Sequence, residues 1–333
     1  MDTQKTRNRQ RTAENGREVS VIIPNWNGVV HLPTCLDSLR RQTLEDFETI
    51  VVDNGSTDGS LELLRQEYPE VTLLPLGENH GFAGACNAGI RAAQGQFIIL
   101  LNNDTECHPR WLKEVALAFN RHPEAGSVAS RMMLFDRRDT FHTAGDFYRI
   151  DGIPGNRGVW EKDKGQYNEE EHVFSACGGS AAYRRTMLDE IGLLDEDFFY
   201  SCEDVDLGWR AQLAGWRCVY APQAIVYHKL SATGGGSTAS YYDGRNFIYL
   251  LTKDYPGDLW RSHWHAILRT QLSITKSALL AFRGEAARAR LRGQIAGLLG
   301  IPRMLRKRRA VQRSRTVSKA YLKRLLTPVD ETP

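Results

Sequence analysis

The sequence predicts an α/β protein with an open, mostly parallel central sheet and helices on both faces. Short apolar-rich runs at 19–24, 47–52, 71–76 and 97–101 alternate with segments in which apolar residues repeat at helical spacing. Strands buried on both faces read as unbroken apolar runs, and strands that alternate with helices favour parallel pairing. Ligands of such sheets bind beyond the carboxyl ends of the strands, so the residues there are the first candidates for a site.

The composition is that of a soluble globular protein. Of the 333 residues, 41% are hydrophobic and 25% are charged, which suits one large domain with an appendage. Six cysteines are scattered without a C-x-x-C pair, which indicates reduced, mostly buried thiols in a cytosolic protein and argues against a zinc site. Residues 1–17 are polar, and we expect a disordered leader rather than a signal peptide. No apolar stretch is long enough to span a membrane.

The C-terminal region is strongly basic. We expect helix from Tyr241 onward with breaks at Pro256 and Pro302, and a basic amphipathic tail over 252–333. Apolar residues lie among the bases, so the tail suits an anionic membrane surface. A nucleic-acid tail and a solvated helix are the alternatives, and the lack of interleaved aromatics disfavours nucleic acid. The bases are Arg288, Arg290, Arg292, Arg303, Arg306, Lys307, Arg308, Arg309, Arg313, Arg315, Lys319 and Lys323.

Polar side chains follow three of the predicted strands and should meet at one edge of the sheet. A carboxylate there can accept hydrogen bonds from a nucleobase or ribose, or bind a hard cation such as Mg²⁺ or Mn²⁺. The alternative is a set of turns and helix N-caps. No G-x-G-x-x-G follows the first strand, which excludes the dinucleotide-binding pattern. The residues are Pro24, Asn25, Trp26 and Asn27 after the first strand, Asp53 after the second, and Asn102, Asn103 and Asp104 after the fourth.

A second acidic cluster lies in the other half of the chain. Glu203 and Asp204 precede a predicted helix, and either could supply a general base. Asp206 and Arg210 have the spacing of a structural ion pair on that helix. His228 closes the last predicted strand, where it could bind a metal or a phosphate.

Taken in order, these segments resemble the inverting family 2 glycosyltransferases of the GT-A fold, and in particular their bacterial rhamnosyltransferase-like branch. The resemblance covers about 19–251. It implies a GT-A domain at 18–251, with a nucleotide-binding half at 18–108 and an acceptor half at 109–251, followed by the basic tail at 252–333. The matching motifs lie at 21–27, 52–60, 79–87, 101–104 and 203–207, with His228, the run 242–246 and Lys253 after them.

The resemblance implies a role for each matching residue. Asp204 would be the catalytic base, with Glu203 as its rival. Asp104 would bind a Mg²⁺ or Mn²⁺ ion that bridges the diphosphate, and His228 would complete the cation shell or contact the leaving diphosphate. The donor-binding residues would be Pro24, Asn25, Trp26, Asn27, Asp53, Asn79, Gly81, Asn87, Asn102, Asn103, Gly178 and Gly179, with Arg91 and Ser180 beside them.

One position departs from the family pattern. The family usually has Asp-x-Asp where this chain has Asn102-Asn103-Asp104, so Asp104 is the only acid of the motif. Asparagine keeps a hydrogen-bond acceptor without a charge. The Asn-Asn-Asp run is similar to runs that are common in the rhamnosyltransferase-like branch. We therefore still expect sugar transfer, with one carboxylate at the cation.

By this resemblance, the expected function is inverting sugar transfer to a glycan or polyprenyl-linked acceptor in cell-surface polysaccharide synthesis. dTDP-rhamnose is the leading donor and a UDP-hexose is the alternative. We expect the protein at the cytoplasmic face of the inner membrane, held through its tail, without a nucleic-acid partner. A nucleotidyltransferase would need a glycine-rich, lysine-bearing loop after the first strand, which is absent. A non-catalytic carbohydrate-binding protein is disfavoured because Asp104 and Asp204 are both present.

Overall fold

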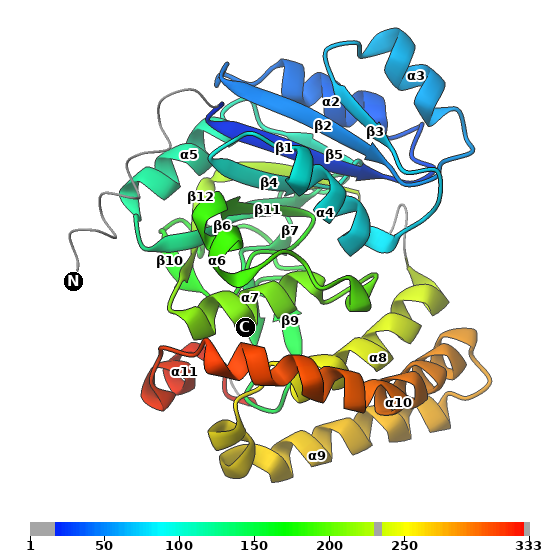
Figure 1. Cartoon of the computed structure of the whole chain (residues 1–333), viewed down its shortest axis with the longest axis vertical. Helices are drawn as coiled ribbons and strands as arrows, with labels where there is room; N and C mark the ends of the chain where they lie inside the picture. The colour runs from blue at the N-terminus through cyan, green and yellow to red at the C-terminus, as the bar shows by residue number, and fades with distance from the viewer. Residues whose placement is uncertain (1–16, 230–234, 330–333) are drawn as a thin grey trace.

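The computed structural model describes residues 17–229 and 235–329 (Figure 1). A ten-stranded sheet lies between two layers of helices, and four further helices from the C-terminal part lie together at one end of the molecule. Of the predicted leader, only Arg17 falls within the described residues.

The central sheet confirms the predicted, mostly parallel α/β architecture. Four strands follow one another in the order β3-β2-β1-β4 and are all parallel. β11 is inserted antiparallel between β4 and β6, and β12 pairs in parallel with β6. The sheet contains β1 (Val19–Asn25), β2 (Phe47–Asp53), β3 (Thr72–Pro75), β4 (Phe97–Leu101), β5 (Thr105–Cys107), β6 (Ala125–Leu134), β7 (Phe141–Thr143), β10 (Glu171–Val173), β11 (Ser180–Arg184) and β12 (Arg217–His228). A separate hairpin pairs β8 (Asp146–Tyr148) with β9 (Pro154–Asn156).

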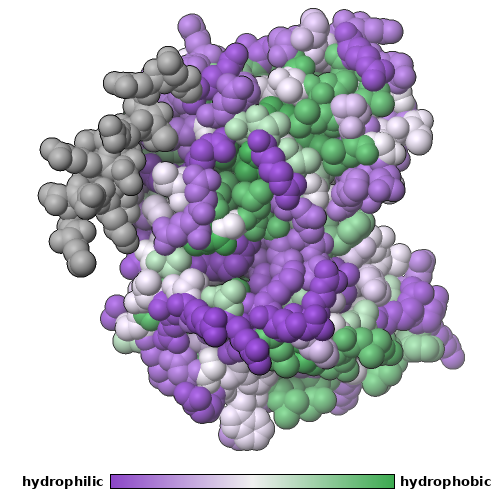
Figure 2. Space-filling model, in the orientation of Figure 1, coloured by the Kyte–Doolittle hydropathy of each residue, from purple (hydrophilic) through white to green (hydrophobic). Residues whose placement is uncertain are grey.

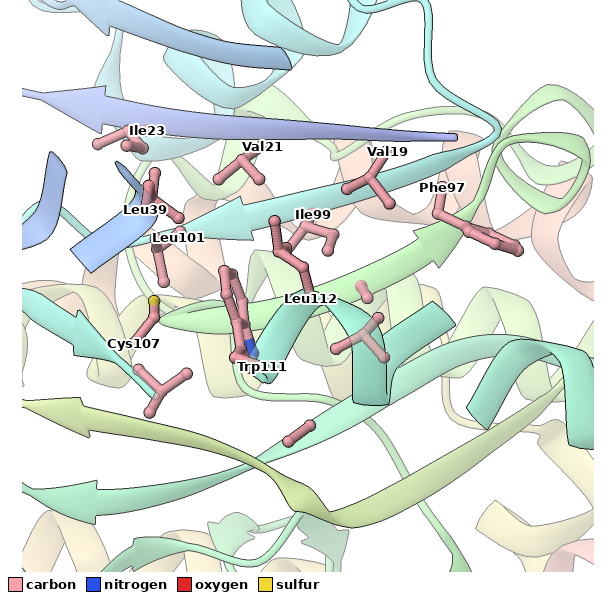
Figure 3. Close-up of a cluster of buried hydrophobic side chains, with 14 of the residues drawn as sticks. Val19, Val21, Ile23, Leu39, Phe97, Ile99, Leu101, Cys107, Trp111 and Leu112 are labelled. Carbon is pink, nitrogen blue, oxygen red and sulfur yellow. The ribbon is translucent and has the colours of Figure 1, made fainter. Parts of the chain in front are cut away.

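The first strand is buried on both faces, which explains its unbroken apolar run. Val21 and Ile23 point into the cluster drawn in Figure 3, which includes Trp111 and Leu112. Ile22 points to the opposite face. The first cluster contains residues of α2 (Leu32–Arg40), α3 (Ser60–Glu67) and α5 (Trp111–Arg121), and the second contains residues of α4 (Gly81–Ala92), α6 (Arg185–Ile191) and α7 (Glu203–Ala214).

The C-terminal part of the described chain is helical, as predicted. It contains α8 (Gly236–Lys253), α9 (Gly257–Leu280), α10 (Glu285–Arg313) and α11 (Lys319–Leu325). The break at Pro256 is confirmed, but the break at Pro302 is wrong because Pro302 lies inside α10. Pro302 is exposed, so its ring stays away from the face of α10 that packs on α8, and this packing holds the helix across the missing backbone donor. The domain division stays a prediction, although its boundary at 251 falls inside α8.

The basic residues of the tail do not form one separate surface. Several pair with carboxylates of residues 17–229 and of the helices around them. The ion pairs are Arg290 with Asp243, Arg303 with Asp197, Lys307 with Asp195 and Asp197, and Arg315 with Asp258. Among the described residues, no helix combines the length and the hydropathy of a membrane span. The six cysteines are unpaired, and all but Cys177 are buried, as predicted.

Candidate active site

A cavity of about 700 Å³ opens at the carboxyl ends of β1 and β4, where the sequence predicts the site. Its far wall is formed by the turn at Phe199 and Tyr200 and by the start of α8. The described residues that line it are Pro24, Asn25, Trp26, Asn54, Asn79, Gly81, Phe82, Asn102, Asn103, Asp104, Phe199, Tyr200, His228, Gly235, Thr238 and Tyr242.

A chain of hydrogen bonds joins the ends of three strands beneath the cavity. Asn103 Nδ2 donates to Asn25 Oδ1 at 2.7 Å, and Asn25 Nδ2 donates to Asp53 Oδ1 at 3.2 Å. The second oxygen of Asp53 accepts from the backbone N–H of Ser56 at 3.1 Å. Asp53 is 1% exposed and does not line the cavity, so its carboxylate fixes the positions of Asn25 and the 54–56 turn.

Asp104 and His228 meet at the opposite side of the cavity. His228 Nε2 lies 3.1 Å from Asp104 Oδ1 and 3.3 Å from Asn102 Nδ2. Both side chains are brought there by strand pairing, since His228 of β12 is in register with Thr105 of β5. A carboxylate and an imidazole therefore converge within hydrogen-bonding distance beside the Asn102 amide, and these two groups are ligands that Mn²⁺ accepts.

His142 supports this pair, and the sequence analysis did not identify it. Its Nδ1 lies 3.1 Å from His228 Nδ1. Burial, with the nearby His228, lowers the pKa of His142 to about 3, so His142 is neutral. One of the two facing nitrogens must carry a proton and the other must accept. When His228 Nδ1 is the donor, His228 Nε2 keeps its lone pair and can bind a cation, so His142 can select the tautomer that binds metal.

The glycine pair Gly178-Gly179 lies between the cation-binding candidates and Asp204. The backbone N–H of Gly178 donates to Asp204 Oδ2 at 2.7 Å. Gly179 packs on the other side, where an added Cβ would lie 3.4 Å from Asn102 Nδ2 and 3.6 Å from His228 Cε1. An added Cβ on Gly178 would lie 3.5 Å from Cε1 of Phe82, a cavity-lining residue. Asp204 therefore lies just behind the cavity wall. Only Gly178 and Gly179 separate it from Asn102 and His228.

The two acids at the start of α7 differ in their surroundings. Burial raises the pKa of Asp204, while hydrogen bonds from the backbone N–H groups of Gly178 and Val205 act to lower it. Burial, with the charge of Asp204, raises the pKa of Glu203 well above its usual range. Glu203 Oε2 is buried without a hydrogen-bond partner among the described residues. Asp204 is the acid that is both oriented by backbone donors and beside the cavity.

A strained turn presents Tyr200 and Asp204. Phe199, Ser201 and Cys202 have φ values of 61°, 67° and 68°, a region that costs about 1–3 kcal/mol for each non-glycine residue. Asn246 on α8 holds the turn through its Nδ2, which lies 3.1, 2.9 and 2.6 Å from the carbonyl oxygens of Phe198, Tyr200 and Ser201.

Comparison with known proteins shows the family of the chain. The model of "Glycosyl transferase family 2" matches residues 20–192, just over half of the sequence. The chain belongs to glycosyl transferase family 2. The N-acetylglucosaminyl-diphospho-decaprenol L-rhamnosyltransferase of Mycobacterium tuberculosis is 29% identical to this transferase over 295 residues, 82% of this chain and 95% of the relative. This likeness agrees with the rhamnosyltransferase-like branch that the motifs predict.

Solved glycosyltransferases share the fold of this transferase. A structure of GalNAc-T7 with UDP, GalNAc and Mn²⁺ aligns with a TM-score of 0.59 at 16% identity, over 72% of this chain and 48% of the other. The mannosyltransferase PcManGT from Pyrobaculum calidifontis, in complex with GDP-Man and Mn²⁺, aligns with a TM-score of 0.52 at 19% identity, over 94% and 88%. The transferase therefore has the predicted GT-A fold.

Asn87, predicted to contact the donor of the transferase, and Arg91, a possible further contact, do not line the cavity, and their contact with a donor stays a prediction. Asn87 is 2% exposed, and its amide is used within the protein: Nδ2 donates to the Leu194 carbonyl and to Glu196, and Oδ1 accepts from the Leu194 N–H. Arg91 is paired with Glu196 in the same contact. These side chains anchor the segment before the strained turn instead of lining the cavity. The motif spacing does not reveal this because the partners are more than a hundred residues away.

Asn27 also stands outside the cavity lining. Its Oδ1 accepts from the N–H of Thr57 at 2.8 Å, and its N–H donates to Ser56 Oγ at 2.9 Å. With a φ of 52°, it closes the turn that carries Trp26 into the cavity. Its direct contact with a donor stays a prediction, as do the contacts of Asp53, Gly178, Gly179 and the other donor-binding residues named from the sequence.

The structure adds aromatic residues that the sequence analysis missed. Phe199 and Tyr242 line the cavity with ring centroids 5.5 Å apart, and Tyr200 lies edge-on to Tyr242 at 5.8 Å. Tyr242 belongs to the 242–246 motif, to which the sequence assigns no role.

A group of three possible metal ligands, His122, Glu124 and His172, lies at the opposite edge of the sheet, before β6 and on β10. None of the three lines the cavity, so this group is separate from it. Both histidines are paired with Glu124.

We predict that Asn246→Ala lowers kcat at least about tenfold and changes KM for the donor much less. The substitution leaves buried carbonyls without a donor, at a cost of about 1–3 kcal/mol, and releases the turn that carries Tyr200 and Asp204. Steady-state kinetics and thermal unfolding measure the two effects. Asn120→Ala, on the exposed side of α5, is the matched control and should leave both unchanged. A normal kcat in a destabilised Asn246→Ala protein would show that Asn246 serves stability alone.

Proposed function

We propose that this transferase moves L-rhamnose from dTDP-rhamnose to a sugar carried on a polyprenyl diphosphate, with inversion at the anomeric carbon. The observation that carries the proposal is the place of Gly178 and Gly179, which lie between Asp204 and the pair of Asn102 and His228 at the cavity. A base and a diphosphate site on opposite sides of a narrow, side-chain-free segment suit a single displacement at a sugar carbon. The donor and acceptor classes are taken from the name of the Mycobacterium tuberculosis relative, whose length is matched over 95%.

Asp204 acts as the general base. Its carboxylate is oriented by the N–H groups of Gly178 and Val205, and one lone pair of each oxygen remains for the acceptor hydroxyl. Its raised pKa makes it a stronger base than an exposed aspartate. As the acceptor oxygen attacks the anomeric carbon, Asp204 takes the hydroxyl proton and the nucleoside diphosphate leaves from the opposite face. One displacement inverts the configuration without a covalent intermediate.

The cation site is the pair Asp104 and His228, with the Asn102 amide beside it. These side chains fit Mg²⁺ or Mn²⁺, and the imidazole favours Mn²⁺. A cation bound there would stabilise the negative charge that builds on the leaving diphosphate. Pro24, Asn25 and Trp26 would hold the nucleobase and ribose at the other end of the cavity.

Thermal unfolding with a panel of nucleotide sugars tests the donor proposal. dTDP-rhamnose with Mn²⁺ should raise the melting temperature most, since a ligand at a hundred times its Kd stabilises the folded state by about 2.7 kcal/mol. A larger response to a UDP-hexose would replace rhamnose by that sugar. No response to any nucleotide sugar, in a protein that unfolds cooperatively, would contradict the proposed function.

We expect Asp104→Ala to lose the Mn²⁺-dependent part of this stabilisation. The substitution removes the only carboxylate of the Asn102-Asn103-Asp104 motif. Asp37→Ala, a half-exposed aspartate on α2, is the matched control and should keep the full Mn²⁺ effect. Equal Mn²⁺ dependence in both variants would remove Asp104 from the cation site.

The acceptor proposal places the transferase at the cytoplasmic face of the membrane, because a polyprenyl-linked sugar lies at a lipid surface. This is consistent with the basic residues of the tail, part of which remain exposed after the ion pairs with carboxylates are formed. Transfer at this surface would serve the synthesis of a cell-surface polysaccharide.

A further inference from the structure

The C-terminal helices form a second large hollow, which has no part in the proposed chemistry. A groove of about 1140 Å³ runs between α9 and α10, with the end of α8 as its floor. Figure 2 shows hydrophobic residues gathered at the lower right, over α9 and α10. The apolar residues that line the groove are Ile248, Leu251, Trp260, Trp264, Ile267, Leu268, Leu272, Leu279, Phe282, Leu291, Ile295, Leu298 and Ile301.

Large apolar side chains stand open to solvent in this groove. Leu272 on α9 is 59% exposed, and Ile295 and Leu298 on α10 are 60% and 58% exposed. Trp264, Leu268 and Leu272 recur every four residues, so they form one continuous face of α9. Soluble proteins rarely leave such a contiguous apolar surface without a partner.

The charges around the groove are almost all positive. Arg261, Arg269 and Lys276 are exposed along α9, and none of them forms an ion pair among the described residues. Arg288 and Arg292 line the groove from α10. Exposed arginines then extend the same face of α10 beyond the apolar stretch: Arg306, Arg309 and Arg313. The acids of α9 and α10 are Asp258, which is paired with Arg315, and Glu285.

One helix joins this groove to the catalytic cavity. Tyr242 of α8 lines the cavity, and Ile248, six residues later, lines the groove. At a rise of about 1.5 Å per residue, the two positions are separated by about 9 Å along the helix. A surface that occupied the groove would therefore lie close to the sugar-transfer site.

We propose that the α9–α10 groove docks on an anionic phospholipid bilayer, with its apolar lining in contact with the acyl region and the flanking arginines and lysines at the headgroups. The combination of an apolar face with cationic borders is that of interfacial helices, and Trp264 suits the interface between lipid and water. This inference rests on the proposed function, since it explains how a lipid-linked acceptor reaches Asp204. It assigns membrane contact to one defined groove rather than to the whole basic tail.

Flotation of the full chain with vesicles tests the groove directly. The wild-type protein should float with phosphatidylglycerol vesicles and much less with phosphatidylcholine vesicles. The Leu272→Asp, Leu298→Asp double variant should bind phosphatidylglycerol vesicles at least about tenfold more weakly, because each aspartate keeps its position out of the apolar region. Leu280→Asp is the matched control and should float normally, since Leu280 is 79% exposed on α9 but does not line the groove. Normal flotation of the double variant would overturn the proposal.

Charge-reversal variants, assayed with a soluble acceptor and with a vesicle-embedded acceptor, provide a second test. This test does not depend on the folding of the Leu272→Asp, Leu298→Asp variant. Arg269→Glu with Arg292→Glu should weaken binding to anionic vesicles, whereas Arg65→Glu on α3 should not. Both groove variants should keep transfer to a short, water-soluble acceptor and lose transfer to an acceptor embedded in vesicles. A groove that instead joins two copies of the chain would give a wild-type dimer in sedimentation, monomeric variants and no flotation. Failure of the wild-type protein to transfer sugar to either acceptor would contradict the proposed function and leave the flotation result standing.

Discussion

Asp204→Asn is expected to lower kcat by about two to four orders of magnitude, the usual contribution of a general base. The amide cannot accept the acceptor's proton, and it can keep only one of the two backbone hydrogen bonds that Asp204 accepts from Gly178 and Val205. Binding of the nucleotide sugar should persist because Asp204 is absent from the cavity lining. Rates under saturating donor and thermal shifts with donor measure the two properties separately.

Glu203→Gln is the matched comparison for the base assignment. Glu203 is more deeply buried, and its Oε2 has no partner among the described residues, so neutralising it should change kcat much less. A larger loss in Glu203→Gln than in Asp204→Asn would transfer the base role to Glu203.

The pH profile gives an independent check. Burial raises the pKa of Asp204, and the base acts in its ionised form. The rate should therefore fall with decreasing pH through a pKa above that of an ordinary aspartate, and this step should disappear in Asp204→Asn.

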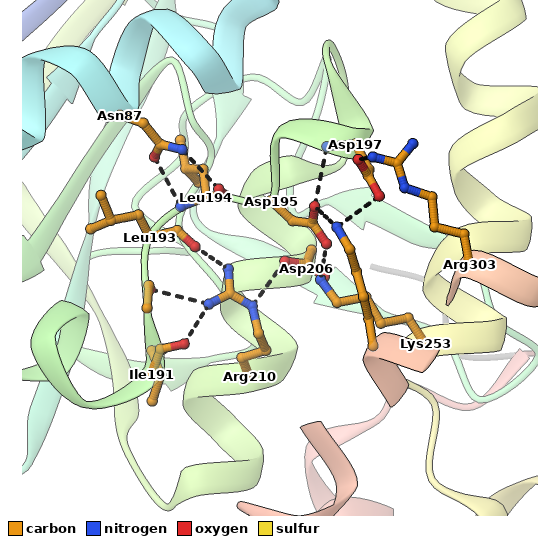
Figure 4. Close-up of polar contacts among 12 residues, drawn as sticks. Asn87, Ile191, Leu193, Leu194, Asp195, Asp197, Asp206, Arg210, Lys253 and Arg303 are labelled. Carbon is orange, nitrogen blue, oxygen red and sulfur yellow. Dashed lines mark hydrogen bonds and ion pairs between the residues drawn. The ribbon is translucent and has the colours of Figure 1, made fainter. Parts of the chain in front are cut away.

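Lys253→Met is expected to destabilise the folded protein by about 3–5 kcal/mol, the effect of breaking a buried ion pair. Lys253 is 3% exposed, and its Nζ bonds Asp195 Oδ2 at 2.6 Å and also Asp206 Oδ1 (Figure 4). Burial acts to raise the pKa of Asp206, but the charges of Lys253 and Arg210 lower it, so the carboxylate stays ionised. Without Lys253, buried negative charge is left with less compensation.

Denaturant unfolding of four variants measures this effect: Lys253→Met, Asp206→Asn, their combination and a control. Lys113→Met, at an exposed position of α5, is the control and should change stability by less than about 0.5 kcal/mol. Asp206→Asn combined with Lys253→Met should cost less than the sum of the single variants, since the two side chains interact directly. Additive losses would show that the pair is not coupled.

The predicted parts of the site are those that depend on strand ends. Asn25, Asn103 and Asp104 were placed together from sequence because the carboxyl ends of parallel strands share one edge, and the structure puts them in one cavity. The pair of Asp206 and Arg210 was also correct, at 2.9 Å, because its geometry is set within a single helix. In both cases the sequence pattern within single strands or a single helix was sufficient to predict which side chains meet.

The remaining parts depend on contacts between distant segments. His142 reaches His228 across 86 positions of the chain, and Asn87 reaches Leu194 across 107. Nothing in the spacing around Asn87 distinguishes a donor contact from an internal hydrogen bond. The tail shows the same limit: which bases face carboxylates and which face solvent depends on how α10 is rotated against α8, and composition does not specify this.

The most direct measurement is the product formed by the purified full chain with dTDP-rhamnose, Mn²⁺ and a polyprenyl-diphosphate-linked N-acetylglucosamine. Mass spectrometry should show the acceptor heavier by one deoxyhexose, with dTDP released in equal amount. Nuclear magnetic resonance should show the anomeric configuration opposite to that of the donor, and Asp204→Asn should form the product about two to four orders of magnitude more slowly. A retained anomeric configuration, or release of dTMP in place of dTDP, would contradict single-displacement sugar transfer at this site.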